Sequence, residues 1–194
     1  MKDEKDEVHT DLRVIRTRHC IENALLELMQ TNSLGKLSVS QICDAALVNK
    51  GTFYRYYQDK YDLASRTASE LLTEMDQLLR QRFAARIGTH SKALDSSNTK
   101  RLNEVVGGLI LLRDVEVDRI PVRDRVRRLI ASLLQPYADE GLISEDVETE
   151  AWVLSMILFD YPTYAKEVKR PLRPAEYARS VQEVVGIYEQ VFQD

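Results

Sequence analysis

The residues best suited to bind a ligand lie close together in residues 47–63, LVNKGTFYRYYQDKYDL. Five of these residues are aromatic, in a chain that is 7% aromatic overall, and they stand beside three cations, Lys50, Arg55 and Lys60. Cations attract phosphate oxygens, and threonine and tyrosine hydroxyls donate hydrogen bonds to them. The segment therefore indicates a surface that contacts a nucleic acid.

Helical side-chain directions divide this segment into an inward and an outward set. On a helix that begins at Lys50, Phe53 and Tyr57 are four positions apart and share one face. We expect that face to close a core against four apolar residues, Ile21, Leu25, Val39 and Ile42. The alternative, that the aromatic residues are core and the lysines only solubilise the helix, suits Phe53 and Tyr57 but not the outward set.

The outward residues each suit a contact with DNA. Gly51 lets the backbone approach a base pair, and Arg55 is long enough to reach a guanine edge. The hydroxyls of Thr52, Tyr54 and Tyr56 suit phosphate oxygens. An ordinary solvated helix face would instead favour Glu, Lys and Gln.

Elsewhere the residue types indicate no catalytic chemistry. The sequence has no spaced Ser/His/Asp or Cys/His set, no glycine-rich phosphate loop and no cluster with metal-ligand spacing. We therefore expect a protein that is not an enzyme and needs no cofactor or metal. Cys20 and Cys43 fall among apolar neighbours and are predicted to be small core residues.

Composition limits where such a surface can be. The net charge of −4 and pI of about 5.5 exclude a protein that is basic throughout, so a nucleic-acid surface must be local. Residues 10–66 carry eight Lys/Arg against six Asp/Glu, and the rest carries 19 against 25. The apolar runs are too short for a membrane helix, and the charged start is not a signal peptide. We expect a cytoplasmic protein with no membrane partner.

The spacing of apolar residues predicts an all-α fold. After a disordered tail over residues 1–9, we expect helices over 11–30, two turns after Ser38, and 50–57, 60–86, 99–117, 121–140, 145–165 and 174–193. Ser38 with Gln41 has the pattern of a capping box, and Asn49 and Asp59 can cap the next two helices. Two short helices joined by a tight turn, with a third behind them, form a helix-turn-helix arrangement whose second helix can enter a major groove.

The segment SVSQICDAALVNKGTFYRYYQDKYDL resembles the DNA-binding segment of TetR-family transcriptional regulators. The usual family pattern is roughly T-x-x-x-I-A-x-x-A-G-V-S-x-G-T-x-Y-x-H-F-x-x-K-x-x-L, and the resemblance covers about residues 15–63. The residues in register are Ile42, Ala46, Val48, Gly51, Thr52, Tyr54, Lys60 and Leu63. Four positions depart from the pattern: Leu47 replaces the turn glycine, Asn49 a serine, Tyr56 a histidine and Tyr57 a phenylalanine.

The resemblance implies an N-terminal helix-turn-helix head, residues 10–58, joined by a long helix to a regulatory and dimerisation domain, residues 59–194. The residues then expected to contact DNA are Arg16, Ser38, Ser40, Lys50, Gly51, Thr52, Tyr54, Arg55, Tyr56 and Lys60. Arg13 and Arg18 are further candidates for phosphate or minor-groove contacts.

The resemblance also implies a homodimer on a palindromic double-stranded operator and a small-molecule effector bound in the second half. We expect the last two helices to form the dimer interface, with a seam of Tyr177, Val181, Val184, Tyr188 and Val191. A monomeric bundle that buries both helices is the alternative. The candidate ligand-lining residues are Leu109, Leu112, Tyr137, Trp152, Met156 and Phe159.

Two functions therefore remain open. The first is a dimeric repressor that a small molecule releases from its operator. The second is a TetR-like helical protein that acts without an inducer, through DNA or a protein partner, as a co-activator or architectural factor. The residues name no effector class, no operator and no target gene.

Overall fold

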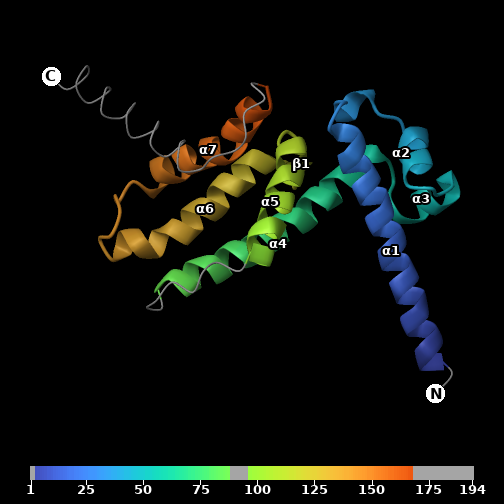
Figure 1. The fold of residues 1–194 in the computed structure, drawn as a ribbon, viewed down its shortest axis with the longest axis horizontal. Helices are drawn as coiled ribbons and strands as arrows, with labels where there is room; N and C mark the ends of the chain where they lie inside the picture. The colour runs from blue at the N-terminus through green and yellow to red at the C-terminus, as the bar shows by residue number, and fades with distance from the viewer. Residues whose placement is uncertain (1–2, 88–95, 168–194) are drawn as a thin grey trace. The chain divides into compact units, whose positions relative to one another are not determined.

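The computed structural model describes residues 3–87 and 96–167, which are mostly helical (Figure 1). The helices are α1 (Asp3–Met29), α2 (Val39–Ala45), α3 (Lys50–Tyr56), α4 (Lys60–Ile87), α5 (Ser96–Leu111), α6 (Val122–Asp139) and α7 (Val147–Glu167). A 3₁₀ turn, η1 (Leu34–Lys36), precedes α2, and a hairpin of β1 (Glu116–Val117) and β2 (Ile120–Pro121) separates α5 from α6. The predicted all-α fold is confirmed, with this hairpin as a minor addition.

Helices α1, α2 and α3, here called the head, pack around one apolar core. Phe53 and Tyr57 are fully buried, as are their predicted partners Ile21, Leu25 and Ile42. Leu63, in the first turn of α4, has no exposed surface either. The inward face predicted for α3 is confirmed, and the start of α4 is anchored in the same core. Val39, expected in this core, is half-buried.

Side chains cap the short helices as the sequence predicts. The Ser38 Oγ accepts a hydrogen bond from the Gln41 N–H at 3.2 Å, and the Gln41 Oε1 accepts one from the Ser38 N–H at 2.8 Å. The Asn49 Oδ1 accepts from the Thr52 N–H at 2.8 Å. The Asp59 Oδ1 accepts from the N–H groups of Tyr61 and Asp62, both at 2.8 Å. These bonds satisfy donors that a helix start otherwise leaves without partners.

Helix α4 supports the elements that follow it. Both α5 and α6 pack on α4, and β1 also contacts it. The Ser65 Oγ on α4 donates a hydrogen bond to the Glu116 carbonyl of β1 at 2.9 Å. The buried side chain of Val117 lies in the same strand, so the hairpin is held against α4 by polar and apolar contacts.

Two boundaries differ from the prediction. Helix α1 begins at Asp3, so the tail expected over residues 1–9 is helical from its third residue; the sequence DEKDE has no helix breaker, and acidic residues suit a helix N-terminus. Helix α5 ends at Leu111, before the hairpin. The hairpin turn has Asp118 and Arg119 both at positive φ, 49° and 64°, as a two-residue type I′ turn requires.

The prediction that both cysteines are core residues is wrong for Cys20. Cys43 is buried as expected, but Cys20 is exposed, because it shares a helix face with the exposed Arg16 and Asn23, four positions before it and three after it. Both thiols are free.

By its internal contacts the chain divides into two compact units, Met1–Ser155 and Met156–Asp194. The head and α4 to α6 therefore belong to one unit. Among the helices of the described residues, none combines the length and the apolar character that crossing a bilayer requires. The predicted helix over 174–193 lies outside the described residues.

Candidate nucleic-acid interface

The turn between α2 and α3 is closed by backbone hydrogen bonds. The Leu47 N–H donates to the Asp44 carbonyl at 3.3 Å, and the Val48 N–H donates to the Cys43 carbonyl at 3.0 Å. This pair of bonds is a Schellman motif, which places Leu47 at the position where glycine is usual. Leu47 has φ = 54°, in the left-handed region, which costs an L-residue about 1–2 kcal/mol. The turn therefore keeps its tight geometry without the glycine.

Helix α3 presents the predicted outward residues on its outer face. Lys50, Gly51 and Arg55 are exposed, and the Tyr54 side chain is 55% exposed. Thr52 and Tyr56 are half-buried at the margins of this face. The Tyr54 ring rests edge-on against Phe53, with ring centroids 5.4 Å apart, so a buried ring holds an exposed one in place. The outward positions predicted for Gly51, Tyr54 and Arg55 are confirmed, whereas Thr52 and Tyr56 are only partly exposed.

The serines of α2 are placed differently from each other. The Ser38 hydroxyl is engaged in its capping box, and it also donates to the Gln41 Oε1 at 2.9 Å. Ser40, in the first turn of α2, is half-buried. Ser38 therefore contributes first to the start of α2, and any contact it makes with a phosphate is additional to that role.

Lys60 is held by the head itself. Its Nζ donates to the carbonyls of Gly35 at 2.9 Å and Leu37 at 2.6 Å, on either side of the end of η1. The same ammonium lies 5.1 Å from the centroid of the Tyr61 ring. Two of its three donors are thus used to fix the loop before α2 to the start of α4. The sequence predicted its charge but not this structural role.

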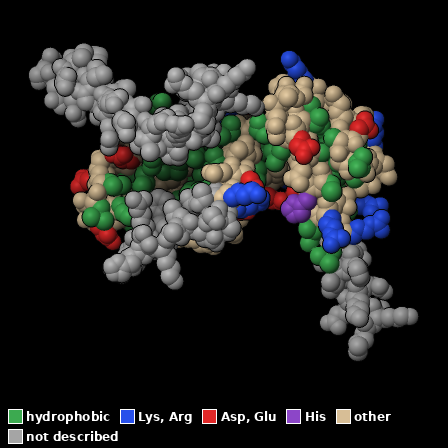
Figure 2. All heavy atoms as spheres, in the orientation of Figure 1, with side chains coloured by type: hydrophobic (Ala, Val, Ile, Leu, Met, Phe, Trp, Pro, Cys, Tyr) green, Lys and Arg blue, Asp and Glu red, His purple; other side chains and the backbone are tan. Residues whose placement is uncertain are grey.

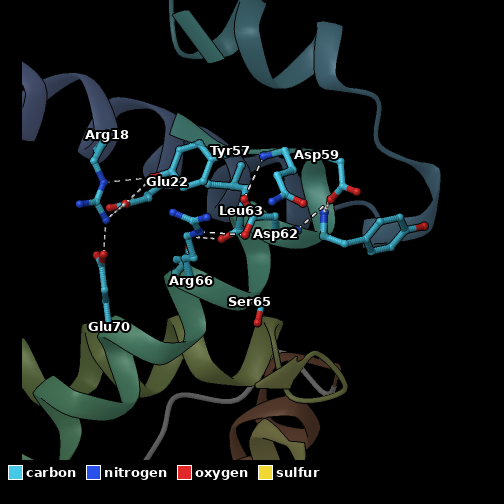
Figure 3. Close-up of polar contacts among 12 residues, drawn as sticks. Arg18, Glu22, Tyr57, Asp59, Asp62, Leu63, Ser65, Arg66 and Glu70 are labelled. Atoms are coloured by element: carbon cyan, nitrogen blue, oxygen red, sulfur yellow. Dashed lines mark hydrogen bonds and ion pairs between the residues drawn. The ribbon is translucent and has the colours of Figure 1, made fainter. Parts of the chain in front are cut away.

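The arginines of α1 differ in whether they are exposed or bound to other residues of the chain. Arg13 and Arg16 are exposed, whereas Arg18 is turned toward other parts of the chain (Figure 3). Its guanidinium lies 3.5 Å from the Tyr57 hydroxyl and 3.5 Å from the Glu22 carboxylate, and it forms an ion pair with Glu70 of α4. Arg18 is therefore committed to internal partners and is not a free cation for DNA.

A buried carboxylate stands at the centre of this network. Glu22 is only 6% exposed, and its Oε1 accepts a hydrogen bond from the Tyr57 hydroxyl at 2.7 Å. His19 Nδ1 lies 3.4 Å from the other carboxylate oxygen. Burial raises the pKa of the Tyr57 hydroxyl well above its ordinary value, and the bond to Glu22 raises it further, although Arg18 opposes both. Tyr57 is therefore a neutral donor at physiological pH.

Sequence reasoning treated Tyr57 as a ring in the core and missed what its hydroxyl does. A network of four side chains joins α1, the end of α3 and α4; its members are Arg18, Glu22, Tyr57 and Glu70. The signal was present in the sequence, because Tyr57 stands where the family pattern has phenylalanine. A buried hydroxyl in place of a hydrogen needs a partner, and the buried partner is Glu22.

Charge is distributed unevenly over the surface. On the face that Figure 2 shows, Lys and Arg side chains gather on the head beside α1. This agrees with the excess of Lys and Arg in residues 10–66. An anionic ligand would therefore meet attractive charge there and net repulsive charge elsewhere on the chain.

The six candidate ligand-lining residues have three different environments. Leu109, Leu112 and Phe159 are buried, and Tyr137 is half-buried. Trp152 and Met156 instead lie at the surface, 51% and 43% exposed, because residues 151–159 of α7 are apolar on nearly every side and the helix can bury only part of its circumference. A depression of about 430 Å³ lies elsewhere, on α4, lined by Ser69, Glu70, Thr73, Glu74 and Gln77. The proposed dimer seam, Tyr177, Val181, Val184, Tyr188 and Val191, lies outside the described residues.

Comparison with known proteins identifies the head. Residues 21–67 match the family model of bacterial regulatory proteins of the tetR family. This range contains α2, α3, the caps at Ser38, Asn49 and Asp59, and the first turns of α4. Comparison with curated proteins gives no sequence match.

Solved structures share the fold over most of the chain. A crystal structure of a gamma-butyrolactone receptor (ArpA-like protein) is 19% identical, covers 93% of this chain and 100% of its own, and has a TM-score of 0.53. Regulatory protein TetR from Rhodobacter sphaeroides is 24% identical, with coverage of 79% and 90% and a TM-score of 0.55. The fatty acid degradation regulator FadR from Bacillus halodurans is 17% identical, with coverage of 76% and 85% and a TM-score of 0.55.

These likenesses establish the fold, and the family model establishes what the head is. The proteins matched are regulators rather than enzymes, in line with the expectation from the sequence. The solved structures show that the chain has the fold of TetR-type regulators, and residues 21–67, which hold the capped α2 and α3 and the closed turn, are a helix-turn-helix domain of the tetR family.

Proposed function

We propose that this chain is a homodimeric transcriptional repressor that binds a palindromic operator through α3 and is released from it by a small-molecule ligand. The observation that carries the proposal is the division of α3. Phe53 and Tyr57 are fully buried, while Lys50, Tyr54 and Arg55 of the same helix are exposed. Stability explains the buried pair, and DNA binding explains the exposed set.

The proposed contacts follow from exposure and chemistry. Lys50 and Arg16 supply charge to phosphates, and Tyr54 donates a hydroxyl to a phosphate oxygen. Arg55 reaches a guanine edge, while Gly51 allows the backbone close to the base pairs. The remaining proposed contacts, at the margins of the same surface, are Ser38, Ser40, Thr52, Tyr56 and the third donor of Lys60.

The apolar surface of α7 supports dimerisation. Trp152, Val153, Leu154 and Met156 are each at least 40% exposed. A group of large apolar side chains at the surface commonly marks a protein interface. We assign α7 and the seam predicted over 174–193 to a two-fold interface, which would place two heads on the two halves of a palindrome.

Ligand release is proposed to act through α4. Leu63 is buried in the head, and Glu70 is paired with Arg18 of α1, so a displacement of α4 carries the head with it. A ligand that favours one position of α4 would shift the population of DNA-competent dimers. The likeness to a protein described as a gamma-butyrolactone receptor supports a ligand by analogy of fold, without naming one for this chain.

An electrophoretic shift with the DNA upstream of the protein's own gene tests the proposal. We expect Lys50→Ala to weaken binding and to reduce the slope of log K against log salt by about one phosphate contact. Tyr54→Phe removes only a hydroxyl, so it should weaken binding without changing the slope. Lys100→Ala, which removes an exposed lysine of α5, is the matched control and should leave binding unchanged.

A shift that neither substitution alters would contradict the assignment of α3. A panel of small molecules added to the bound complex then tests release. A compound that abolishes the shift and raises the melting temperature supports the repressor; stabilisation of the order of 2.7 kcal/mol is expected at 100 times its Kd. If no compound does either, the inducer-free alternative replaces it.

A further inference from the structure

Leu47, in the turn between α2 and α3, combines two features that stability does not favour. Its φ of 54° lies in the left-handed region, where a Cβ is crowded and glycine is the favoured residue. The residue is 93% exposed, more than any other large apolar residue whose exposure the structure describes. The leucine thus strains the backbone and buries almost nothing in return.

The turn itself does not require a leucine. The two hydrogen bonds that close it use the backbone N–H groups of Leu47 and Val48. Glycine at position 47 could make the same bonds without strain. Strained residues that the surrounding structure enforces are concentrated at binding and catalytic sites, so the strain points to a role outside the folded chain.

The position of Leu47 indicates what that role is. It lies two residues before Asn49, the N-cap of α3, so their Cα atoms are within about 7 Å of each other. Lys50, a proposed phosphate contact, follows directly after that cap. The exposed isobutyl group therefore lies near the start of α3, the end that we propose enters the groove, and the neighbouring contacts assigned there to Lys50 and Tyr54 are polar.

The major groove offers one apolar group to such a side chain, the C5-methyl of thymine. We propose that Leu47 is a specificity-determining residue, whose side chain packs on a thymine methyl at the edge of each operator half-site. The proposal rests on the DNA-binding function proposed above. It adds to that function a base preference read by the turn rather than by α3.

The test begins with duplexes that the wild-type protein selects from a random-sequence pool. Binding is then measured on a selected duplex and on copies in which each thymine in turn is replaced by uracil, which lacks the methyl group. We expect one symmetric pair of replacements to weaken wild-type binding about fourfold per half-site, the effect of one buried methyl group. Leu47→Ala should weaken binding to the thymine duplex similarly and be insensitive to that replacement.

Leu47→Gly separates this role from a structural one. Because glycine relieves the strain, its melting temperature should be at least that of the wild type, yet its affinity should fall as that of Leu47→Ala does. Leu142→Ala is the control, since Leu142 is also a largely exposed leucine and lies outside the head. This variant should retain the wild-type affinity and the wild-type sensitivity to the uracil replacement.

Two results would overturn the inference and leave the proposed function standing. In one, Leu47→Ala and Leu47→Gly bind the selected duplex as tightly as the wild type while Lys50→Ala does not. In the other, replacement of thymine by uracil weakens binding equally in the wild type and in all the Leu47 variants. If the wild-type protein instead enriches no sequence from the pool, the DNA-binding function fails, and this inference fails with it.

Discussion

The head and α7 differ in how completely the chain buries its apolar side chains and pairs its buried polar groups. In the core of the head, which the first turn of α4 completes, Phe53, Tyr57 and Leu63 have at most 1% of their surface exposed, and the buried Glu22 has a hydrogen-bond donor and a cation beside it. In α7, by contrast, Trp152 is about half exposed, among other exposed apolar side chains.

The difference teaches where partners are to be expected. A head whose core is closed needs no other protein to fold around it, so its exposed residues are available for recognition. An apolar helix surface loses free energy in water until something covers it. We therefore propose that the two regions bind different partners, the head a polar, charged partner and α7 an apolar one.

The largest expected effect tests whether the head is closed in this sense. Phe53→Ala removes a fully buried ring and leaves a cavity, so we expect the free energy of unfolding to fall by about 3–5 kcal/mol. Urea denaturation followed by circular dichroism measures it.

Tyr54→Ala is the control for this substitution, because it removes the neighbouring ring from the exposed side of the same helix. It should cost less than about 1 kcal/mol, most of it from the edge-on contact with Phe53. Equal losses for the two variants would mean that the head is not packed as described.

A second, smaller effect tests whether α7 awaits a partner. Trp152→Ala removes the largest exposed apolar side chain of α7, and we expect it to weaken a dimer about 30-fold, which corresponds to about 2 kcal/mol. Sedimentation equilibrium over a range of concentrations measures the dissociation constant.

Leu142→Ala serves again as a comparison, since this residue is exposed but follows α6 rather than lying in α7. Its dissociation constant should match that of the wild type. A wild-type protein that stays monomeric at all concentrations would remove the contrast between the two regions.

The third effect concerns the polar part of the head. Tyr57→Phe keeps the ring but leaves the buried Glu22 without its 2.7 Å donor, so we expect a loss of about 1–3 kcal/mol near neutral pH. It also changes the response to alkali. Because the pKa of Tyr57 is raised in the folded protein, its contribution is fully present below the unfolded pKa of about 10 and is lost as the pH rises above it.

Urea midpoints measured from pH 7 to 11 distinguish the two proteins. The wild type should lose more stability than Tyr57→Phe does between pH 9.5 and 11, so the two curves converge. Parallel curves would show that the Tyr57 hydroxyl is not held as a neutral donor in the folded state.

Much of the head could be predicted because its determinants are local. The caps at Ser38, Asn49 and Asp59 depend on residues no more than three positions away, and each forms as expected. The burial of Phe53 and Tyr57 follows from their spacing on one helix. The position of the turn also follows from the pattern, although no local rule explains a leucine there.

What could not be predicted depends on contacts between distant residues. Nothing near Lys60 in the sequence indicates that its ammonium binds carbonyls at Gly35 and Leu37, more than twenty residues earlier. Arg18 and Glu70 are 52 residues apart, so their pairing is visible only in the fold. The hairpin was missed because the valines of residues 115–117 also fit the end of an apolar helix.

The outward position of Cys20 has a practical consequence. Of the two cysteines, Cys43 is buried, and burial raises the pKa of its thiol, so little reactive thiolate forms there. A maleimide spin label should therefore attach selectively to Cys20 of the natural sequence. In a dimer, each α1 helix would carry one such label. Pulsed electron paramagnetic resonance would then measure the distance between the two labels, and so the separation of the heads, with and without DNA.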